Sequence, residues 1–147
     1  MILIIKIYKK YIGQNKKINY LIIYKMESIC SRYTGQYASG EEDAIMRICE
    51  KYTGQNANSA TDAFERICSK YTGSYASGIT DAAERICSRY TGQNASGLDD
   101  AAMRMCEKYT GQNANSGRDA AERVAGKYSG GYGSAREPWA AIIAPIL

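Results

Sequence analysis

The sequence predicts a repeat protein of mainly short α-helices that alternate with Gly-, Ser- and Asn-rich loops, extended and without a single large core. A 19-residue unit recurs along most of the chain, and each copy carries a helix signal followed by a loop signal. Bulky aliphatic side chains gather at the two ends of the chain. The repeats between them hold few such side chains. At about 25 cal/mol per Å², the apolar surface that a repeat could bury hardly offsets an ordering cost of about 1–2 kcal/mol per residue. We therefore expect short elements that stack on neighbours or on partners.

Residues 1–29 form a Lys-, Ile- and Tyr-rich segment that differs from everything after it. Its first 25 residues hold six Lys and no acid, and its apolar runs are far shorter than the roughly 20 residues that cross a bilayer. The abrupt change of composition at Met26 leads us to expect that translation begins there. The alternative is a decayed repeat, because Lys10–Asn15 resembles Lys51–Asn56.

Five tandem repeats occupy residues 30–124, and a degenerate sixth repeat with an apolar tail occupies residues 125–147. From Cys30 the units read CSRYTGQYASGEEDAIMRI, CEKYTGQNANSATDAFERI, CSKYTGSYASGITDAAERI, CSRYTGQNASGLDDAAMRM, CEKYTGQNANSGRDAAERV and AGKYSGGYGSAREPWAAII. The openings CSR, CEK and CSK return in order after three units, which indicates that a block of three units duplicated as a whole.

One unit shows how the pattern is read. Thr80 and Asp81 suit a helix N-terminal turn, and the run from Ala82 to Arg89 consists of good helix formers. Gly92 stands where a helix would end in a left-handed residue, and the polar stretch 93–97 reads as a loop.

A helix of about ten residues is marginal alone in water, so its stability depends on what its apolar stripe contacts. Strict antiparallel pairing of helices would need an alternating 38-residue pattern, which this sequence does not show. We therefore expect no regular helical solenoid, and we expect the array to be weakly structured without a partner.

Charge and cysteine usage exclude several classes of function. Residues 26–147 hold 13 basic and 15 acidic side chains, a balance of 13 − 15 = −2, without the basic stripe that nucleic-acid binding requires. The chain has no His and no C-x-x-C pair, so no zinc site is expected. Five cysteines, one in each unit, make a poor disulfide framework, and a buried apolar role is favoured over a functional thiol. They are Cys30, Cys49, Cys68, Cys87 and Cys106.

Two roles are open for the tyrosine that recurs in each unit. It is either an anchor for a protein partner, since Tyr gives a large contact area at low entropic cost, or the last apolar contact of each helix. We take this set as the candidate partner-binding residues: Tyr33, Tyr52, Tyr71, Tyr90, Tyr109 and Tyr128.

The recurring Asp and Arg are expected to be structural, with Asp in the first helical turn and Arg one turn later as its ion-pair partner. No second titratable group converges on the Asp within a unit, and no nucleophile has a recognisable base beside it, so no catalytic residue is assigned and no enzyme is expected. Identical linked units instead favour multivalent binding through effective concentration.

The order Cys30-Ser31-Arg32, then Tyr33-Thr34-Gly35, then Gly40 and Asp43, resembles the segment around the bilin-attaching cysteine of cryptophyte phycobiliprotein alpha subunits. The same motif occurs in red-algal phycobilisome scaffolding proteins. The resemblance implies an antenna linker that docks on phycoerythrin or a related phycobiliprotein with an acidic or mixed surface. It places the protein at the stromal side of the chloroplast thylakoid.

The same resemblance implies that the five repeated cysteines lie close to bilin. No cofactor is assigned to the chain itself, and bilin would come through the partner. Two other classes stay open. One is a self-assembling structural protein that forms filaments or an extracellular or cytoskeletal array, and the other, ranked last, is a thiol-based redox protein.

Overall fold

The structure is a computed structural model and describes residues 25–130 and 135–147 of the chain. Six helices follow one another at the spacing of the repeat, and a short helix and a 3₁₀ turn come after them. They are α3 (Lys25–Thr34), α4 (Glu41–Thr53), α5 (Ala60–Thr72), α6 (Ile79–Thr91), α7 (Leu98–Thr110), α8 (Gly117–Ser129), α9 (Trp139–Ile143) and η1 (Ala144–Ile146). Residues 1–24 lie outside the described ranges. The predicted start at Met26 and the alternative of a decayed repeat at residues 10–15 both concern this segment and stay predictions.

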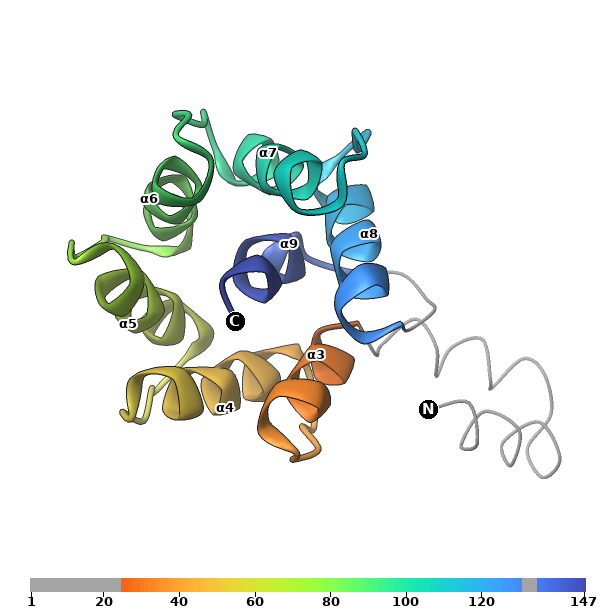
Figure 1. The fold of residues 1–147 in the computed structure, drawn as a ribbon. Helices are drawn as coiled ribbons and strands as arrows, with labels where there is room; N and C mark the ends of the chain where they lie inside the picture. Colours follow the sequence, from red (N-terminus) through yellow and green to blue (C-terminus); the bar gives the residue numbers. More distant parts are fainter. Residues whose placement is uncertain (1–24, 131–134) are drawn as a thin grey trace, which may run out of the picture.

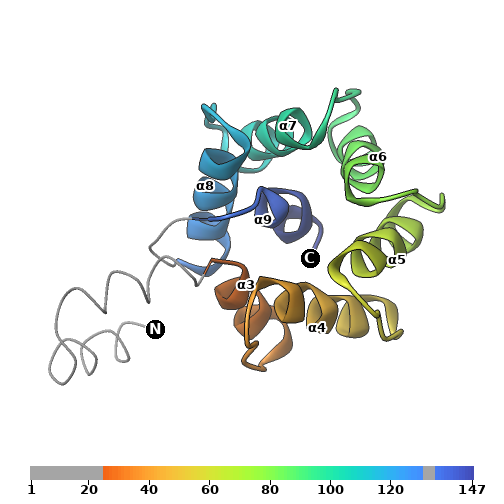
Figure 2. The ribbon, with the colours of Figure 1, turned by 180° about the vertical axis from the view of Figure 1, so that it is seen from behind.

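The helices α3 to α8 form a closed ring around α9 (Figures 1 and 2). Each helix packs on the next, α3 packs on α8, and α9 contacts α3, α6, α7 and α8 from inside the ring. Helices alternating with polar loops are thus confirmed, but the prediction of an extended chain without a single core was wrong. The ring and α9 cover the apolar stripe of every unit, so that the buried side chains form one contiguous core.

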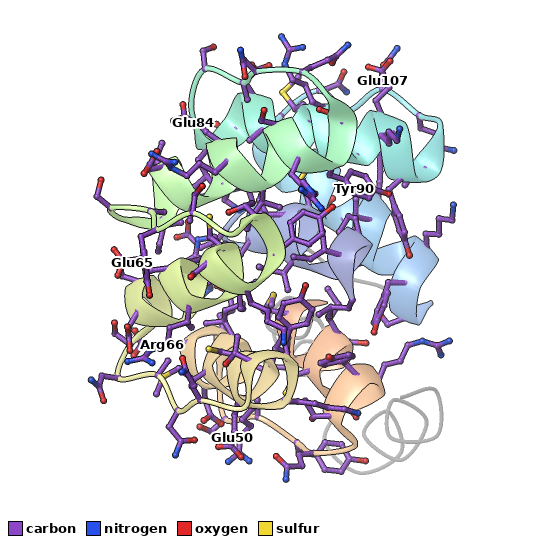
Figure 3. All side chains as sticks on the ribbon, turned by 60° about the vertical axis from the view of Figure 1, so that its left-hand side comes forward. Glu50, Glu65, Arg66, Glu84, Tyr90 and Glu107 are labelled. Atoms are coloured by element: carbon purple, nitrogen blue, oxygen red, sulfur yellow. The ribbon has the colours of Figure 1, made fainter. Side chains whose placement is uncertain are left out.

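Neighbouring helices in the ring run in the same direction. At their C-terminal ends, Lys51 Nζ of α4 donates to the Tyr33 carbonyl of α3 at 2.7 Å. At their N-terminal ends, the Ala60 N–H of α5 lies 3.4 Å from Glu42 Oε2 of α4. In Figure 3, α5 and α6 likewise lie side by side with Glu65 and Glu84 at the same end.

The shared direction explains why the expectation of no regular solenoid was wrong. A 13-residue helix is about 20 Å long, and a six-residue loop spans up to about 20 Å, so each loop can return the chain to the starting end. Every helix then repeats the same relation to its predecessor. No 38-residue alternation is needed, because no antiparallel pair exists in the ring.

Local signals place the helix boundaries. The predicted run Ala82–Arg89 lies within α6, which ends at Thr91, and Gly92 follows with φ 77° in the left-handed region. Before α5, the Ser59 hydroxyl accepts a hydrogen bond from the Asp62 N–H at 3.1 Å, an ordinary N-cap. The helix and loop assignments of the unit are therefore confirmed.

We expect Gly92→Ala to lower the free energy of unfolding by about 1–2 kcal/mol, because a Cβ is strained at positive φ even though no atom lies within 4 Å of it. Chemical denaturation followed by circular dichroism measures the change. Gly126→Ala is the matched control, since Gly126 lies inside α8, has open space around its Cβ position, and does not have a positive φ. If Gly126→Ala lowered the free energy of unfolding as much or more, the left-handed conformation assigned to Gly92 would be wrong.

One position of each unit lies on the inner surface of the ring, and the size of the side chain at this position differs between units. Phe64 of α5 packs edge-to-face on Trp139 of α9, with ring centroids 5.6 Å apart. The equivalent residues of α6, α7 and α8, which contact α9 directly, are all Ala: Ala83, Ala102 and Ala121. Small residues thus stand where α6, α7 and α8 approach α9, whereas the equivalent Phe64 of α5 and Met26 of α3 are large and buried.

Candidate functional site

The recurring tyrosines line the C-terminal ends of the ring helices, where each packs half-buried against the core. At Tyr33, Tyr71 and Tyr109 a basic side chain of the following helix lies over the ring. Lys51 Nζ is 4.8 Å from the centroid of Tyr33, and Lys127 Nζ is 4.7 Å from that of Tyr109. Such cation–π contacts contribute about 0.5–1 kcal/mol at exposed sites. The tyrosine is therefore a contact between units.

The contact that closes the ring has the same form. Arg32 of α3 lies over Tyr128 of α8, with 5.7 Å from Cζ to the ring centroid. Arg32 occupies the position of Lys51 in its own unit. Helix α3 therefore packs on α8 as a following unit would.

Both readings of the tyrosine thus remain compatible with its place in the fold. The tyrosines are contacts of the helix ends, and their partial exposure leaves area for a partner. Burial raises the pKa of the Tyr33, Tyr52, Tyr90 and Tyr128 hydroxyls, so these stay protonated and can donate hydrogen bonds at neutral pH. We call these six tyrosines and the basic residues that precede them the tyrosine end. The basic residues are Arg32, Lys51, Lys70, Arg89, Lys108 and Lys127.

The two ends of the ring differ in charge. The last turns of α3 to α8 each carry a basic residue, and the first turns of α4 to α8 carry acidic ones, among them Glu41, Glu42 and Asp43 of α4. Both arrangements complement the helix dipole. The tyrosine end therefore presents mainly positive charge, interrupted by the exposed Glu50 and Glu107, and the opposite end presents mainly negative charge, with Arg118 as an exception.

The Asp–Arg pairs are confirmed as ion pairs across one helical turn, with N–O distances of 2.9–3.1 Å. In α5, Asp62 also accepts from the Asn58 N–H, and Arg66 donates to Gln55 Oε1 at 3.0 Å. The backbone N–H of Asn58 first, and Arg66 second, lower the pKa of Asp62. The pair thus fixes the preceding loop on its helix.

Open grooves lie beside these ion pairs at equivalent places in two units. One of about 460 Å³ runs along α5 between the loops before and after it, and one of about 330 Å³ lies along α4. Both contain the Gln, Asp and Arg of their unit. Tyr75, at one edge of the larger groove, is 85% exposed.

The cysteines lie under the loops rather than at the surface. All five are buried, and the Cys49 Sγ lies 3.7 Å from both Thr53 Oγ1 and the Gln55 carbonyl oxygen. Burial raises the pKa of the Cys30, Cys49, Cys68 and Cys87 thiols. These thiols are protonated at neutral pH, and a bilin could reach one only if its loop opened.

Sequence reasoning missed the acidic residues that join one unit to the next. Glu65 Oε2 and Glu84 Oε2 each accept the N–H of the glycine before the following helix, Gly78 and Gly97, both at 2.7 Å. The recurring Glu-Arg pair in the middle of the helix is the signal for this contact.

A second missed residue is Glu27 of α3, which is 6% exposed, with no hydrogen-bond partner for Oε1 among the described residues. Burial first, and then the charges of Glu41 and Asp43, raise its pKa from 4.5 to about 7. The folded protein therefore retains a proton on Glu27 that the unfolded chain releases. This linkage stabilises the fold below pH 4.5, and the contribution is lost as the pH rises to about 7.

We expect Glu27→Gln to remove that pH dependence, because the amide stays neutral. The melting temperature of the unsubstituted protein should fall between pH 4.5 and about 7, whereas that of the variant should fall less, since of Glu27 and Glu41 only Glu41, whose pKa burial also raises, still titrates. Thermal unfolding across this range measures it, with the exposed Glu50→Gln as control. Parallel profiles for both variants would show that Glu27 is not the titrating group.

Within the described ranges no cluster of His, Cys, Asp or Glu is placed to hold a metal ion, and no helix is long and apolar enough to cross a membrane. Comparisons of the chain with protein-family models, curated proteins and solved structures gave no match.

Proposed function

We propose that this protein is a non-enzymatic scaffold that binds an acidic protein surface with its tyrosine end. The observation that supports this proposal is the recurrence of a half-exposed tyrosine and a basic residue at six positions around one end of the ring. Positive charge there would steer an acidic partner and suppress basic ones. The partly buried tyrosines would supply rigid area for contact.

In the ring, the six candidate binding positions lie on one compact body and not along an extended array. Six equivalent positions share one end of a compact body, so a single flat partner could meet several of them without any linker being ordered. The phycobiliprotein class that the sequence resemblance implies is the partner we propose. Bilin would then belong to that partner, which agrees with the burial of the five thiols.

The test is a titration of the protein against purified phycoerythrin. Lys70 and Lys108 are exposed, and among the described residues neither makes a hydrogen bond, ion pair or ring contact. We expect Lys70→Glu with Lys108→Glu to raise the Kd by roughly tenfold or more and to weaken its dependence on salt. Both substitutions should leave helicity unchanged.

Arg118→Glu is the matched control, because Arg118 lies in the first turn of α8 at the opposite end. It should change the Kd little. Equal effects at both ends would contradict the role of the tyrosine end. Absence of any binding to phycoerythrin would overturn the proposed partner.

A further inference from the structure

A contact that recurs along the ring is not made by α3, the helix that closes the ring. We propose that Glu27 of α3 is a proton-controlled latch on the loop before α4. With its proton, Glu27 lies buried and unbonded, as in this structure, and without it the carboxylate turns to accept a hydrogen bond from the Gly40 N–H. This inference concerns the joint between α3 and α4 and does not depend on the proposed partner of the tyrosine end.

Glu27 occupies a position of the repeat at which other glutamates join one unit to the next. Its equivalents in α5, α6 and α8 are Glu65, Glu84 and Glu122. Each of these carboxylates accepts the backbone N–H of the residue 13 positions later. The residue 13 positions after Glu27 is Gly40, which directly precedes α4. The bonded residues and the N–O distances are Gly78 at 2.7 Å, Gly97 at 2.7 Å and Ala135 at 3.3 Å.

The residues at the two positions vary together. In α4 and α7 the first position is Met46 or Met103, and the second is then a serine whose hydroxyl caps the next helix, Ser59 or Ser116. Before α6 and α7 the second position is glycine, which has no side chain to cap the helix, and a glutamate of the preceding helix bonds its N–H. Glu27 and Gly40 therefore have the residue types of the bonded pair without its hydrogen bond.

Both groups that would form this bond are unsatisfied. Glu27 is 6% exposed, and its Oε1 has no hydrogen-bond partner among the described residues. Within the same ranges, the Gly40 N–H makes no hydrogen bond. The φ angle of Gly40 is 158°, whereas the bonded Gly78 and Gly97 have φ angles of 99° and 105°. A rotation at Gly40, which its lack of a Cβ allows, together with a turn of the Glu27 side chain, would make the bond.

The proton controls this change because the buried position disfavours a negative charge. Burial first, and then Glu41 and Asp43 of α4, raise the pKa of Glu27 to about 7. Of the other helices packed on α3, α9 has no charged side chain, and Arg118 of α8 is exposed. The remaining charged residues of α8 have other contacts: Asp119 with Arg123, Glu122 with the Ala135 N–H and Lys127 with the Tyr109 carbonyl.

Ionisation and the new hydrogen bond are therefore coupled. The bond to the Gly40 N–H stabilises the ionised form, so the change occurs at a lower pH than the value of about 7 that the buried position sets. The buried form then holds at acidic pH, and the bonded form holds at neutral pH. In the bonded form α3 contacts the N-terminal end of α4 through Gly40, in addition to the contact of Lys51 with the Tyr33 carbonyl at the tyrosine end.

Hydrogen exchange of the Gly40 amide, followed by NMR in the full chain between about pH 4 and pH 8, tests the proposal. Each rate is compared with that of an unstructured peptide at the same pH. We expect the protection of Gly40 to rise roughly tenfold or more in one step, because hydrogen bonds to a charged acceptor are strong. The carboxyl carbon of Glu27 should titrate with the same midpoint. The amides of Gly78 and Gly97, already bonded here, should show no step at that midpoint.

Glu27→Met is the matched variant, since the repeat itself places Met46 and Met103 at this position. It should keep the helicity of the unsubstituted protein and abolish the step at Gly40. If Glu27→Met alone failed to fold, Glu27→Met with Gly40→Ser would replace it, because the pair then matches Met46 and Ser59. The step at residue 40 should again be absent.

Three results would overturn the proposal. The first is a Gly40 amide whose protection does not change with pH in the unsubstituted chain. The second is a step that persists after Glu27→Met. The third is a Glu27 carboxyl that titrates with a midpoint different from that of the Gly40 step, because the carboxyl would then ionise without turning to this N–H.

Discussion

Ile143→Asp is expected to lower the free energy of unfolding by at least about 4 kcal/mol, because it places a carboxylate in the centre of the ring. Ile143 of α9 is fully buried and belongs to the one contiguous core. A loss of this size is a large share of the roughly 5–15 kcal/mol by which domains are stable. Urea denaturation followed by circular dichroism measures it, and the variant should approach the unfolded state in water.

Leu147→Asp is the control for that substitution. Leu147 is only half-buried at the end of the chain, so the new carboxylate keeps contact with water. Its effect should be much smaller. If Ile143→Asp were tolerated equally well, α9 would not occupy the centre of the ring, and the compact architecture would be wrong.

Phe64→Ala is expected to cost about 3–5 kcal/mol, because it leaves a cavity beside Trp139 that a ring held by six helices closes poorly. Phe64 is fully buried on the inner surface of α5. The same denaturation assay reports the loss. Tyr75→Ala, which truncates a side chain that is 85% exposed, should stay within about 0.5 kcal/mol of the unsubstituted protein.

The reverse change tests the same complementarity of size. Ala102→Phe in α7 should destabilise the protein by about 1–3 kcal/mol, since α9 packs directly on α7. If Phe64→Ala lowered the free energy of unfolding but Ala102→Phe did not, the inner side chains would fill space, but α9 would not pack on α7.

The local structure of a unit could be predicted from its sequence, because it depends on neighbours along the chain. The helix containing Ala82–Arg89, the left-handed Gly92 and the Asp81–Arg85 pair all follow from propensity, backbone freedom and helical spacing. These signals act within one turn of helix. They carry no information on what covers the apolar stripe.

The compact ring could not be predicted in the same way. Its closure brings Arg32 onto Tyr128 across most of the described chain, and it depends on the small rotation between successive units adding up to a full turn. The apolar side chains of one unit alone are too few for a core, but in the ring α9 and the two neighbouring helices cover the apolar stripe of each unit. The one usable signal was the change in size at Phe64 and Ala102, which marks an inner surface.

The sequence predicts a candidate set of tyrosines, and whether they bind a partner stays a prediction; their arrangement in space could not be predicted. The recurrence of Tyr71 and its equivalents defines the candidate set, whereas their gathering at one end requires that the helices run in the same direction. That direction rests on contacts between units, such as Lys51 with Tyr33, which the sequence of a single unit does not reveal.

The closed ring is tested most directly by a distance between spin labels on cysteines introduced at residues 32 and 127, in a chain whose five buried native cysteines are replaced by Ala. These positions are equivalent in their units and lie five units apart in sequence. At micromolar concentration, the ring predicts a distance close to that between labels at residues 51 and 70, which lie in adjacent units. An open array with helices about 8–10 Å apart would separate residues 32 and 127 by roughly 40–50 Å, and that result would contradict the ring.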